Sequence, residues 1–437
     1  MDANRFATKS LNDPRILRIL SAALNAVDPY VAVTNHLPKI DGSAYGLAVG
    51  KAAVPMLSAL ADSIPLSGAL AISKHASPAS TPLSADFGLF PLLLGGHPIP
   101  DARSVHAGER AIEFVSSLKE DDTLVCLISG GGSALMTAPL IPLDELQALT
   151  ASLLASGATI NEINTIRRHL DRVKGGGLAR ATKARIVSLI LSDVIGNPLE
   201  VIASGPTVPD PTTREDALLI LGKYLTTVSR RHGDSRLLNS VTQCLRGSTE
   251  TETPKLDDKV FSRVQNIIIG DNKLAAFAGL EQAQREGFGA EILTNELQGE
   301  AREIGVMLAK RLRDEATKRS RPFCLIAGGE TTVTIKGNGK GGRNQELALA
   351  AVDELRDLKN VMLIALATDG EDGPTDAAGA VATGESAERA KRLGLNEADS
   401  LSRNDAYFFF ESLHDLIETG PSGTNVNDLV FLFALGE

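Results

Sequence analysis

Residues 124–136 read LVCLISGGGSALM: an unbroken apolar run, then three glycines and a serine, then the start of a helical pattern. A continuous apolar run, as opposed to an alternating one, is typical of a strand that is buried on both faces of a parallel sheet. Helices that cross over between such strands make βαβ units. This stretch therefore predicts an α/β fold with a glycine-rich loop at the end of a buried strand.

The same pattern recurs along the chain, where short apolar runs end in glycine or a small polar residue and helical periodicity follows. In an open α/β sheet, ligands bind beyond the carboxyl ends of the strands, so the loops that follow these runs are the candidate sites. Helices are predicted at 271–286, with Asp271 as the N-cap, and at 343–355. The predicted strands are 46–49, 69–73, 90–94, 124–129, 186–191, 267–269, 323–327, 361–367 and 426–434.

The length of 437 residues predicts roughly two to three domains. The polar stretch at 247–259 (GSTETETPKLDDK) lacks apolar periodicity and is typical of a linker or an exposed loop. We therefore predict an N-terminal domain of residues 1–255 and a C-terminal domain of residues 256–437.

The composition narrows the class of function. A formal charge of −10 argues against nucleic acid as a partner, because affinity for a phosphate backbone comes largely from lysine and arginine. The N-terminus shows no signal or transit peptide, and no apolar stretch approaches the roughly 20 residues that span a membrane. The three cysteines, Cys126, Cys244 and Cys324, have no metal-site spacing and are expected to be reduced core residues. We expect a cytoplasmic protein without a membrane partner; self-association as a homo-oligomer stays open.

The loop SGGGS, Ser129 to Ser133, is the first candidate site. Its residues Ser129, Gly130, Gly131, Gly132 and Ser133 would present several backbone N–H groups at a helix start, which suits a phosphate or a carboxylate. A tight turn whose glycines serve only packing is the alternative. The loop matches neither the GxxxxGK[ST] phosphate loop nor the GxGxxG dinucleotide fingerprint.

Two cations follow strands in similar loops. Lys51 lies at the start of a predicted helix, where a lysine is unfavourable to the helix dipole, so we expect it to meet an anion in a cleft. Arg343 and Asn344 follow a glycine-rich basic loop and begin a helix, which favours an anion clamp over a flexible hairpin. A surface lysine and a surface hairpin are the corresponding alternatives.

Two carboxylates also follow predicted strands. Asp193 and Asp369 are each candidates for a Mg²⁺ ligand or for the base that accepts a hydroxyl proton. A turn or N-cap aspartate is an equally good interpretation of Asp193 from this pattern alone. His97, in GGHPIPD (95–101), is a candidate substrate contact or simply a turn histidine.

Taken together, these loops resemble the type-2 glycerate kinases, whose C-terminal part is the MOFRL domain. The resemblance spans nearly the whole chain, in the family order. The matching stretches are GKAAVPM (50–56), SGGGSALM (129–136), NTIRRHLDRVKGGGLA (164–179), LSDVIGNPLEVIASGPT (191–207), AGGETTV (327–333), GKGGRNQELALA (339–350), ATDGEDGPTDAAGA (367–380) and PSGTNVNDLV (421–430).

The resemblance implies a two-domain α/β enzyme that uses ATP and Mg²⁺ to phosphorylate D-glycerate, usually to 2-phosphoglycerate. It implies an N-terminal Rossmann-like α/β/α parallel sheet, a smaller C-terminal α/β MOFRL domain and an active-site cleft between them. Asn197 departs from the family pattern, in which an aspartate is expected. Some relatives are named hydroxypyruvate reductases, so an NAD(P)H-dependent hydroxypyruvate reductase is the alternative function, although the chain shows no dinucleotide fingerprint. A third hypothesis is a non-catalytic module that binds a sugar acid or a nucleotide.

The resemblance also implies which residues of this chain, at the positions of the matching motifs, are functional. Lys51, Asp193, Arg343 and Asp369 are the predicted catalytic residues, with Asp193 as a metal ligand. Glu330 and Asn344, which lie in two of these motifs, join the SGGGS loop as predicted phosphate- or substrate-binding residues.

Overall fold

The computed structural model of the chain describes residues 1–75, 90–232, 235–247 and 252–436, and its packing forms two compact units. The N-terminal unit comprises Pro29–Ser192 and Asn197–Ile269. The C-terminal unit comprises Met1–Asp28, Asp193–Gly196 and Gly270–Glu437. The domain edges at residues 255 and 256 stay a prediction; the compact units change at Gly270, and the N-terminal segment packs with the C-terminal unit. Residues 248–251 of the predicted linker lie outside the described residues.

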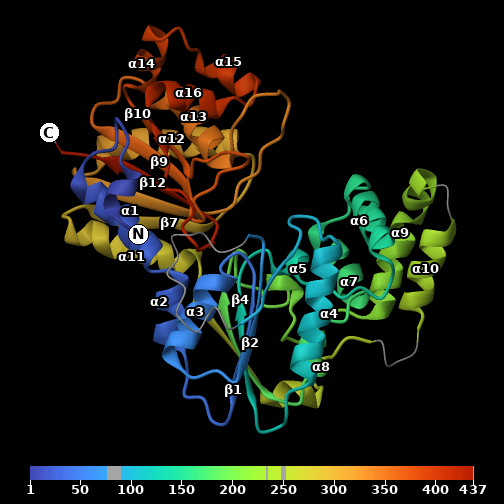
Figure 1. Ribbon diagram of the computed structural model, residues 1–437. Helices are drawn as coiled ribbons and strands as arrows, with labels where there is room; N and C mark the ends of the chain where they lie inside the picture. The colour runs from blue at the N-terminus through green and yellow to red at the C-terminus, as the bar shows by residue number, and fades with distance from the viewer. Residues whose placement is uncertain (76–89, 233–234, 248–251, 437) are drawn as a thin grey trace. The chain divides into compact units, whose positions relative to one another are not determined.

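A six-stranded sheet of order β3-β2-β1-β4-β5-β6 forms the centre of the N-terminal unit (Figure 1). The neighbours from β3 to β5 run parallel, and the strand order is that of a Rossmann-type sheet. The α/β prediction is confirmed here: the apolar runs are strands, and β1, β2, β4 and β5 are buried on both faces, whereas the edge strands β3 and β6 are only partly buried. The strands are β1 (Ala44–Val49), β2 (Gly68–Ser73), β3 (Leu92–Leu94), β4 (Thr123–Ile128), β5 (Arg185–Leu191) and β6 (Val264–Gly270).

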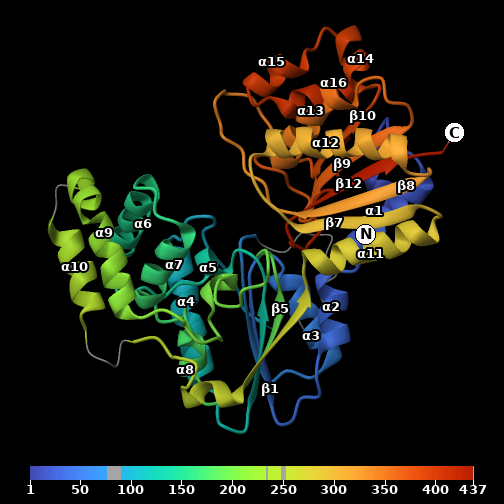
Figure 2. The ribbon, with the colours of Figure 1, turned by 180° about the vertical axis from the view of Figure 1, so that it is seen from behind.

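Some helices of this unit pack beside the sheet, and others form a separate group with its own core. Helices α6, α7, α9 and α10 gather away from the strands around their own apolar core, which includes Leu146, Ile163 and Leu221 (Figure 2). The helices of this unit are α2 (Pro29–His36), α3 (Ala53–Ser63), α4 (Ala102–Ser116), α5 (Gly132–Leu135), α6 (Leu143–Ala155), α7 (Ile160–His169), α8 (Gly177–Ala181), α9 (Arg214–His232) and α10 (Ser235–Leu245), with short 3₁₀ turns η3 (Ile202–Ser204) and η5 (Lys259–Arg263).

The C-terminal unit has a second six-stranded sheet, of order β11-β10-β9-β12-β8-β7. Only β7 and β8 are parallel; β12 runs antiparallel between β8 and β9, and β10 and β11 continue antiparallel. The predicted apolar runs are buried strands here as well. The prediction that they pair in parallel is wrong for most of this sheet, because most of its neighbouring strands are antiparallel. The strands are β7 (Gly289–Leu297), β8 (Phe323–Gly329), β9 (Val361–Ala367), β10 (Gly379–Thr383), β11 (Leu416–Ile417) and β12 (Asp428–Ala434).

Both predicted helices of this unit are present: Asp271 caps α11 by accepting the Leu274 N–H at 2.8 Å, and α13 spans Arg343–Leu355. Helix α1 packs against α11, and α12 packs against α13. No single helix among the described residues is both long and apolar enough to span a membrane, although the consecutive helices α1 and α2 would satisfy length and composition as a bent pair. The helices are η1 (Ala3–Phe6), α1 (Pro14–Asn25), α11 (Asn272–Arg285), α12 (Ala301–Lys318), α13, α14 (Ser386–Arg392), α15 (Glu397–Ser402) and α16 (Ala406–Leu413).

Candidate active site

The SGGGS loop joins β4 to the short helix α5. Gly131 has a φ of 85°, in the left-handed region that favours glycine, and it is the N-cap of α5. Ser129, Gly130 and Gly132 are buried, whereas Gly131 and Ser133 are partly exposed. The predicted glycine turn at the end of a parallel strand is therefore present in the fold.

Lys51 is fixed to this loop through its backbone. Its N–H donates to the Gly130 carbonyl oxygen at 2.9 Å, and the next N–H, of Ala52, donates to Ser129 Oγ at 3.0 Å. Gly50 has a φ of 122°, and a Cβ there would lie 2.2 Å from Ser129 Oγ. The close approach of the two loops therefore requires glycine at position 50, and it brings the predicted Lys51 beside the predicted phosphate loop.

Two further loops complete this surface. His97 lies against Gly131, where an added Cβ would be 3.1 Å from the imidazole Cδ2. Ser133 Oγ lies 2.6 Å from Ser204 Oγ, and Ser204 is held at a φ of 62°, which is uncommon for a residue other than glycine. This direct contact of Ser204 with the glycine loop was not predicted from the sequence.

The local electrostatics favour an anion. Burial, together with the charges of Lys51 and Lys74, lowers the pKa of His97 to about 4. The imidazole is therefore neutral at pH 7, and the positive charge of the surface comes from the two lysines. A bound phosphate or carboxylate would offset the repulsion from the two lysines, which is the smaller cause of the lowered pKa of His97 after burial.

A buried ion pair supports the chain that follows α5. Lys174 Nζ lies 3.0 Å from Asp171 Oδ2 and donates to the Met136 carbonyl at 3.2 Å, and both side chains are 1% exposed. Asp171 also accepts the Val173 N–H at 2.8 Å and the Thr137 hydroxyl. Removing one member would leave a buried charge without its partner, so the pair fixes the geometry of this segment.

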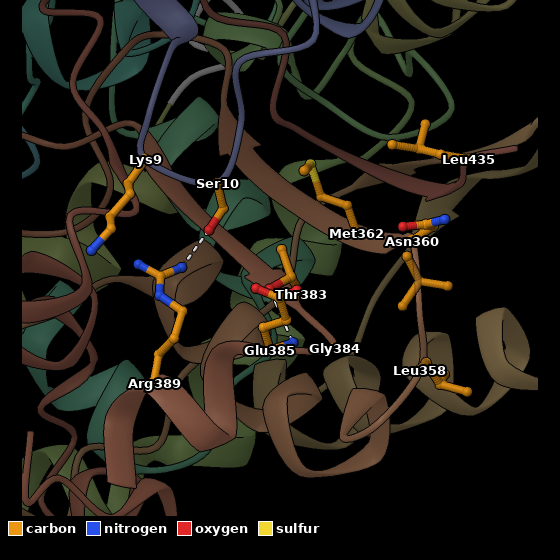
Figure 3. A pocket seen from close by; sticks show the side chains of 11 residues that line it. Lys9, Ser10, Leu358, Asn360, Met362, Thr383, Gly384, Glu385, Arg389 and Leu435 are labelled. Atoms are coloured by element: carbon orange, nitrogen blue, oxygen red, sulfur yellow. Dashed lines mark hydrogen bonds between the residues drawn. The ribbon is translucent and has the colours of Figure 1, made fainter. Parts of the chain in front are cut away.

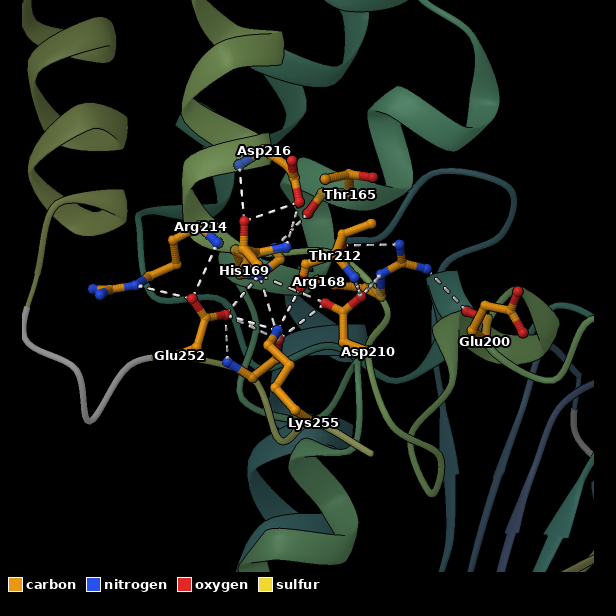
Figure 4. Close-up of polar contacts among 12 residues, drawn as sticks. Thr165, Arg168, His169, Glu200, Asp210, Thr212, Arg214, Asp216, Glu252 and Lys255 are labelled. Carbon is orange, nitrogen blue, oxygen red and sulfur yellow. Dashed lines mark hydrogen bonds and ion pairs between the residues drawn. The ribbon is translucent and has the colours of Figure 1, made fainter. Parts of the chain in front are cut away.

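A second buried network lies at the end of α7, in the layer of helices (Figure 4). Arg168 Nε is 3.0 Å from Asp210 Oδ1, and Arg168 Nη1 donates to the Glu200 carbonyl at 3.2 Å. His169 Nε2 is 3.0 Å from Glu252 Oε1. Because Glu200 lies in the loop that leads to Ser204, Arg168 links α7 to one side of the candidate site. None of these partners was predicted from the sequence.

In the C-terminal unit, Arg343 lies at the start of α13 between two carboxylates. Its Nε and Nη2 donate to Asp428 at 2.6 and 3.0 Å, and its Nη1 donates to Glu330 at 2.7 Å. Burial opposes the charge of the guanidinium, but Asp428 and Glu330 outweigh this effect and raise the pKa of Arg343. The predicted residues Arg343 and Glu330 therefore meet, and Arg343 is already paired in this structure.

Strand pairing explains why Asp428 is there. Asp428 begins β12 opposite Gly329, the last residue of β8, and opposite Ala367, the last residue of β9. The two loops that follow β8 and β9, which carry Glu330 and Asp369, thus flank it. Asp428 lies inside a stretch that matched the family, but its role depends on a strand register that the sequence does not specify.

Asp372 is the second carboxylate that sequence reasoning missed in this role. It accepts the backbone N–H groups of Asn344 at 3.1 Å and Gln345 at 2.8 Å, and the Asn344 side chain at 3.2 Å. The N-cap residue of α13, Gly342, has no side chain, so Asp372 satisfies these helix-end donors from another loop. Burial raises the pKa of Asp372 to about 7. Asn344 is accordingly engaged with Asp372.

The remaining predicted carboxylates also lie in the C-terminal unit. Asp369 Oδ1 accepts the Glu371 N–H at 3.1 Å, and Asp193 Oδ2 accepts the Asn425 side-chain amide at 3.4 Å. Within the described part of the chain, no group of three or more His, Cys, Asp and Glu side chains is arranged to hold a metal ion. The metal role of Asp193 stays a prediction.

A cavity of about 350 Å³ lies at the opposite end of the second sheet (Figure 3). It is lined by the start of β9, the end of β10 and the residue after β12, together with Lys9, Ser10 and Arg389. Arg389 donates to Asp415 at 2.7 Å and to the Ser10 hydroxyl. None of the predicted site residues lines this cavity, so it is separate from the Arg343 cluster within this unit.

Comparison with known proteins agrees with this arrangement of motifs. Residues 15–233 match the model of a domain of unknown function, DUF4147, and residues 323–428 match the MOFRL family. A protein of Pyrococcus horikoshii named glycerate 2-kinase is 40% identical over 95% of both chains. One of Thermotoga maritima named D-glycerate 2-kinase is 40% identical over 95% of this chain and 96% of its own.

A solved structure gives the same result for the fold. The crystal structure of glycerate kinase from Thermotoga maritima matches with a TM-score of 0.84 and 39% identity, over 96% of this chain and 98% of that one. The predicted resemblance is thereby confirmed. The chain belongs to the glycerate 2-kinase family, with an N-terminal DUF4147 domain and a C-terminal MOFRL domain.

Proposed function

We propose that this protein transfers the γ-phosphate of ATP to D-glycerate and forms 2-phospho-D-glycerate. The observation that carries the proposal is the near-complete match to relatives named glycerate 2-kinase. The chemistry of the site supports it, since phosphoryl transfer needs positioning and charge neutralisation more than covalent chemistry. A cytoplasmic location and self-association stay predictions.

The reaction forms one P–O bond and breaks another. A hydroxyl oxygen of glycerate attacks the γ-phosphorus, the bond from that phosphorus to the β,γ-bridging oxygen breaks, and ADP leaves. The hydroxyl proton passes to a carboxylate, for which Asp193 and Asp369 are the candidates.

In the N-terminal unit, the SGGGS loop and Lys51 would hold an anionic group. The Ser129 N–H donates to the Val49 carbonyl at 2.9 Å, so the backbone N–H groups of Gly130–Ser133 are the ones that suit phosphate oxygens. The Lys51 ammonium suits the charge that develops on the leaving or transferring phosphate. The neutral His97 can donate one hydrogen bond without adding charge. The fixed contact between the two loops keeps this arrangement in place before substrate binds.

In the C-terminal unit, Arg343 would exchange one of its two carboxylates for substrate. The Asp428 side chain is 7% exposed and holds two nitrogens of the guanidinium, whereas the Glu330 side chain is 46% exposed and holds one. Glu330 is therefore the easier partner to displace. We assign Asp428 to the orientation of Arg343, and Arg343 to the glycerate carboxylate or the transferring phosphate.

Mg²⁺ is the metal expected for this reaction. The oxygen donors of Asp193 and Asp369 suit Mg²⁺ in kind, because it prefers carboxylates and keeps several of its waters. When bound, Mg²⁺ would neutralise charge on the ATP phosphates. Asn197 has a φ of 57°, a conformation that asparagine tolerates, so the residue that replaces the expected aspartate fits its turn.

The test is a direct assay of the purified chain with ATP, Mg²⁺ and D-glycerate, followed by phosphorus NMR of the product. We expect the 2-phosphate; a product phosphorylated at the 3-hydroxyl would correct the regiochemistry, and no phosphorylated product would refute the proposal. A parallel assay with hydroxypyruvate and reduced nicotinamide tests the alternative function, for which cofactor oxidation is the expected signal.

A further inference from the structure

The N-terminal unit contains an apolar groove whose lining begins at the residue after His97. It has a volume of about 300 Å³, which lies within the range of small-ligand sites. It is lined by the segment Pro98–Pro100 on one side and by helices α6 and α7 on the other. Pro98, which lines the groove, directly follows His97, whose side chain lies against Gly131 of the SGGGS loop.

The walls of the groove carry large apolar side chains that are exposed to solvent. Ile99, Leu154 and Ile160 are 65%, 59% and 60% exposed, and all three line the groove together with Ile163. Glycerate carries an oxygen on every carbon and would lose its hydrogen bonds to water there without recovering them. A flat aromatic base has two apolar faces and gains from such walls.

Arg167 at the side of the groove supplies the second observation. It lies on α7, is partly buried, and lines the groove; burial lowers the pKa of its guanidinium, and the charge of Asp171 opposes that shift. Among the residues that the structure describes, its guanidinium makes no hydrogen bond and no ion pair, whereas its neighbour Arg168 is paired with Asp210. A partly buried guanidinium that has no hydrogen-bond acceptor gains from an anionic ligand beside it.

We propose that this groove binds the adenine base of the nucleotide, with Arg167 on a phosphate of the same molecule. The inference rests on the proposed kinase function and specifies where the nucleotide lies. The base packs between the Pro98–Pro100 segment and the side chains of α6 and α7, and the phosphates extend past Arg167 and His97 toward the SGGGS loop. Gln147 and Thr150 are the polar groups of the wall that can meet the edge of the base.

Two variants of α6 make a matched pair for the test. Ala151 is exposed and lines the groove, so Ala151→Phe fills the space for the base; Ala155 is exposed on the same helix and does not line it, so Ala155→Phe is the control. The second variant, Arg167→Gln, removes the charge and keeps most of the volume. Thermal unfolding of each purified full-length variant checks that the fold is retained.

Calorimetric titration with three probes then separates base from phosphate. We expect Ala151→Phe to weaken binding of ADP and adenosine roughly ten-fold or more, while binding of inorganic tripolyphosphate stays as in the unmodified chain. We expect Arg167→Gln to weaken ADP and tripolyphosphate by roughly ten- to a hundred-fold and to leave adenosine unchanged. Ala155→Phe should match the unmodified chain with all three probes.

The outcomes also separate this inference from the proposed function. If Ala151→Phe and Arg167→Gln bind ADP as tightly as the unmodified chain, the groove is not the base site and the inference is overturned, even where glycerate is phosphorylated. The same holds if the unmodified chain binds no ADP. If ADP binds with the expected pattern but D-glycerate is not phosphorylated, the base site stands and the proposed substrate is wrong.

Discussion

At the scale of single residues, the backbone and the side chain of Lys51 do different things. The backbone N–H holds the SGGGS loop through Gly130, and a substitution at position 51 keeps that bond. Lys51→Ala removes the side chain beyond Cβ, including the ammonium, and keeps the backbone bond, so we expect kinase turnover to fall by at least 100-fold while the unfolding temperature changes little. The control is Lys39→Ala, since the Lys39 side chain is 90% exposed. Near-normal turnover in purified Lys51→Ala would reject the assigned role.

His97 gives a prediction for the dependence of stability on pH. Its pKa in the folded chain is about 4, below the ordinary 6.5, so the unfolded chain binds the proton more readily. The contribution of neutral His97 to stability is therefore complete above pH 6.5 and is lost as the pH falls from 6.5 toward 4. We expect His97→Gln to remove this part of the pH dependence in denaturant unfolding measured between pH 4 and 8. An unchanged slope in the variant would contradict the buried, neutral state of His97.

At the scale of elements, helix α13 depends on a cap that comes from elsewhere in the chain. Asp372 accepts two of its first backbone N–H groups, and Gly342 at the N-cap offers no side chain. Asp372→Ala leaves buried donors unsatisfied, and we expect it to lower the free energy of unfolding by about 1–3 kcal/mol. Because Arg343 begins this helix, turnover should fall as well. Glu371→Ala, in the exposed part of the same loop, should leave both denaturant unfolding and turnover near the unmodified values.

The elements also show what the sequence could and could not predict. Residues next to glycine loops, such as Lys51 and Arg343, were predicted because the loop chemistry is local. Asp428 and Asp372 were missed as partners because their roles come from the register of β12 and from a loop that folds back on α13. Strand β7 was missed because its residues are only partly buried, and β11 because it has two residues, so neither shows a clear apolar run. Motifs formed by neighbouring residues could be predicted from the sequence, whereas contacts between residues far apart in the chain could not.

At the scale of the whole molecule, the first residues of the chain belong with its last third. Asp415, whose side chain is fully buried, accepts the Thr8 hydroxyl at 3.0 Å and the Ser10 N–H at 2.8 Å, and it pairs with Arg389 at 2.7 Å. The bonds join positions about 400 residues apart in sequence and keep the segment that leads into α1 on the C-terminal unit. A single carboxylate therefore ties the beginning of the chain to this unit.

Asp415→Ala tests this connection. The substitution leaves Arg389 without its buried partner and frees Thr8 and Ser10, so we expect a loss of about 3–5 kcal/mol in the unfolding of the C-terminal unit. Hydrogen exchange should accelerate in residues 8–25 together with β10 and β11, whereas β1 and β4 of the N-terminal unit should keep their protection, because each unit has its own core. Asp399→Ala, at an exposed position on α15, is the control. If residues 8–25 exchange in step with β1 and β4 and not with β10, the N-terminal segment is part of the other unit's cooperative structure, and the assignment of Met1–Asp28 by packing is wrong.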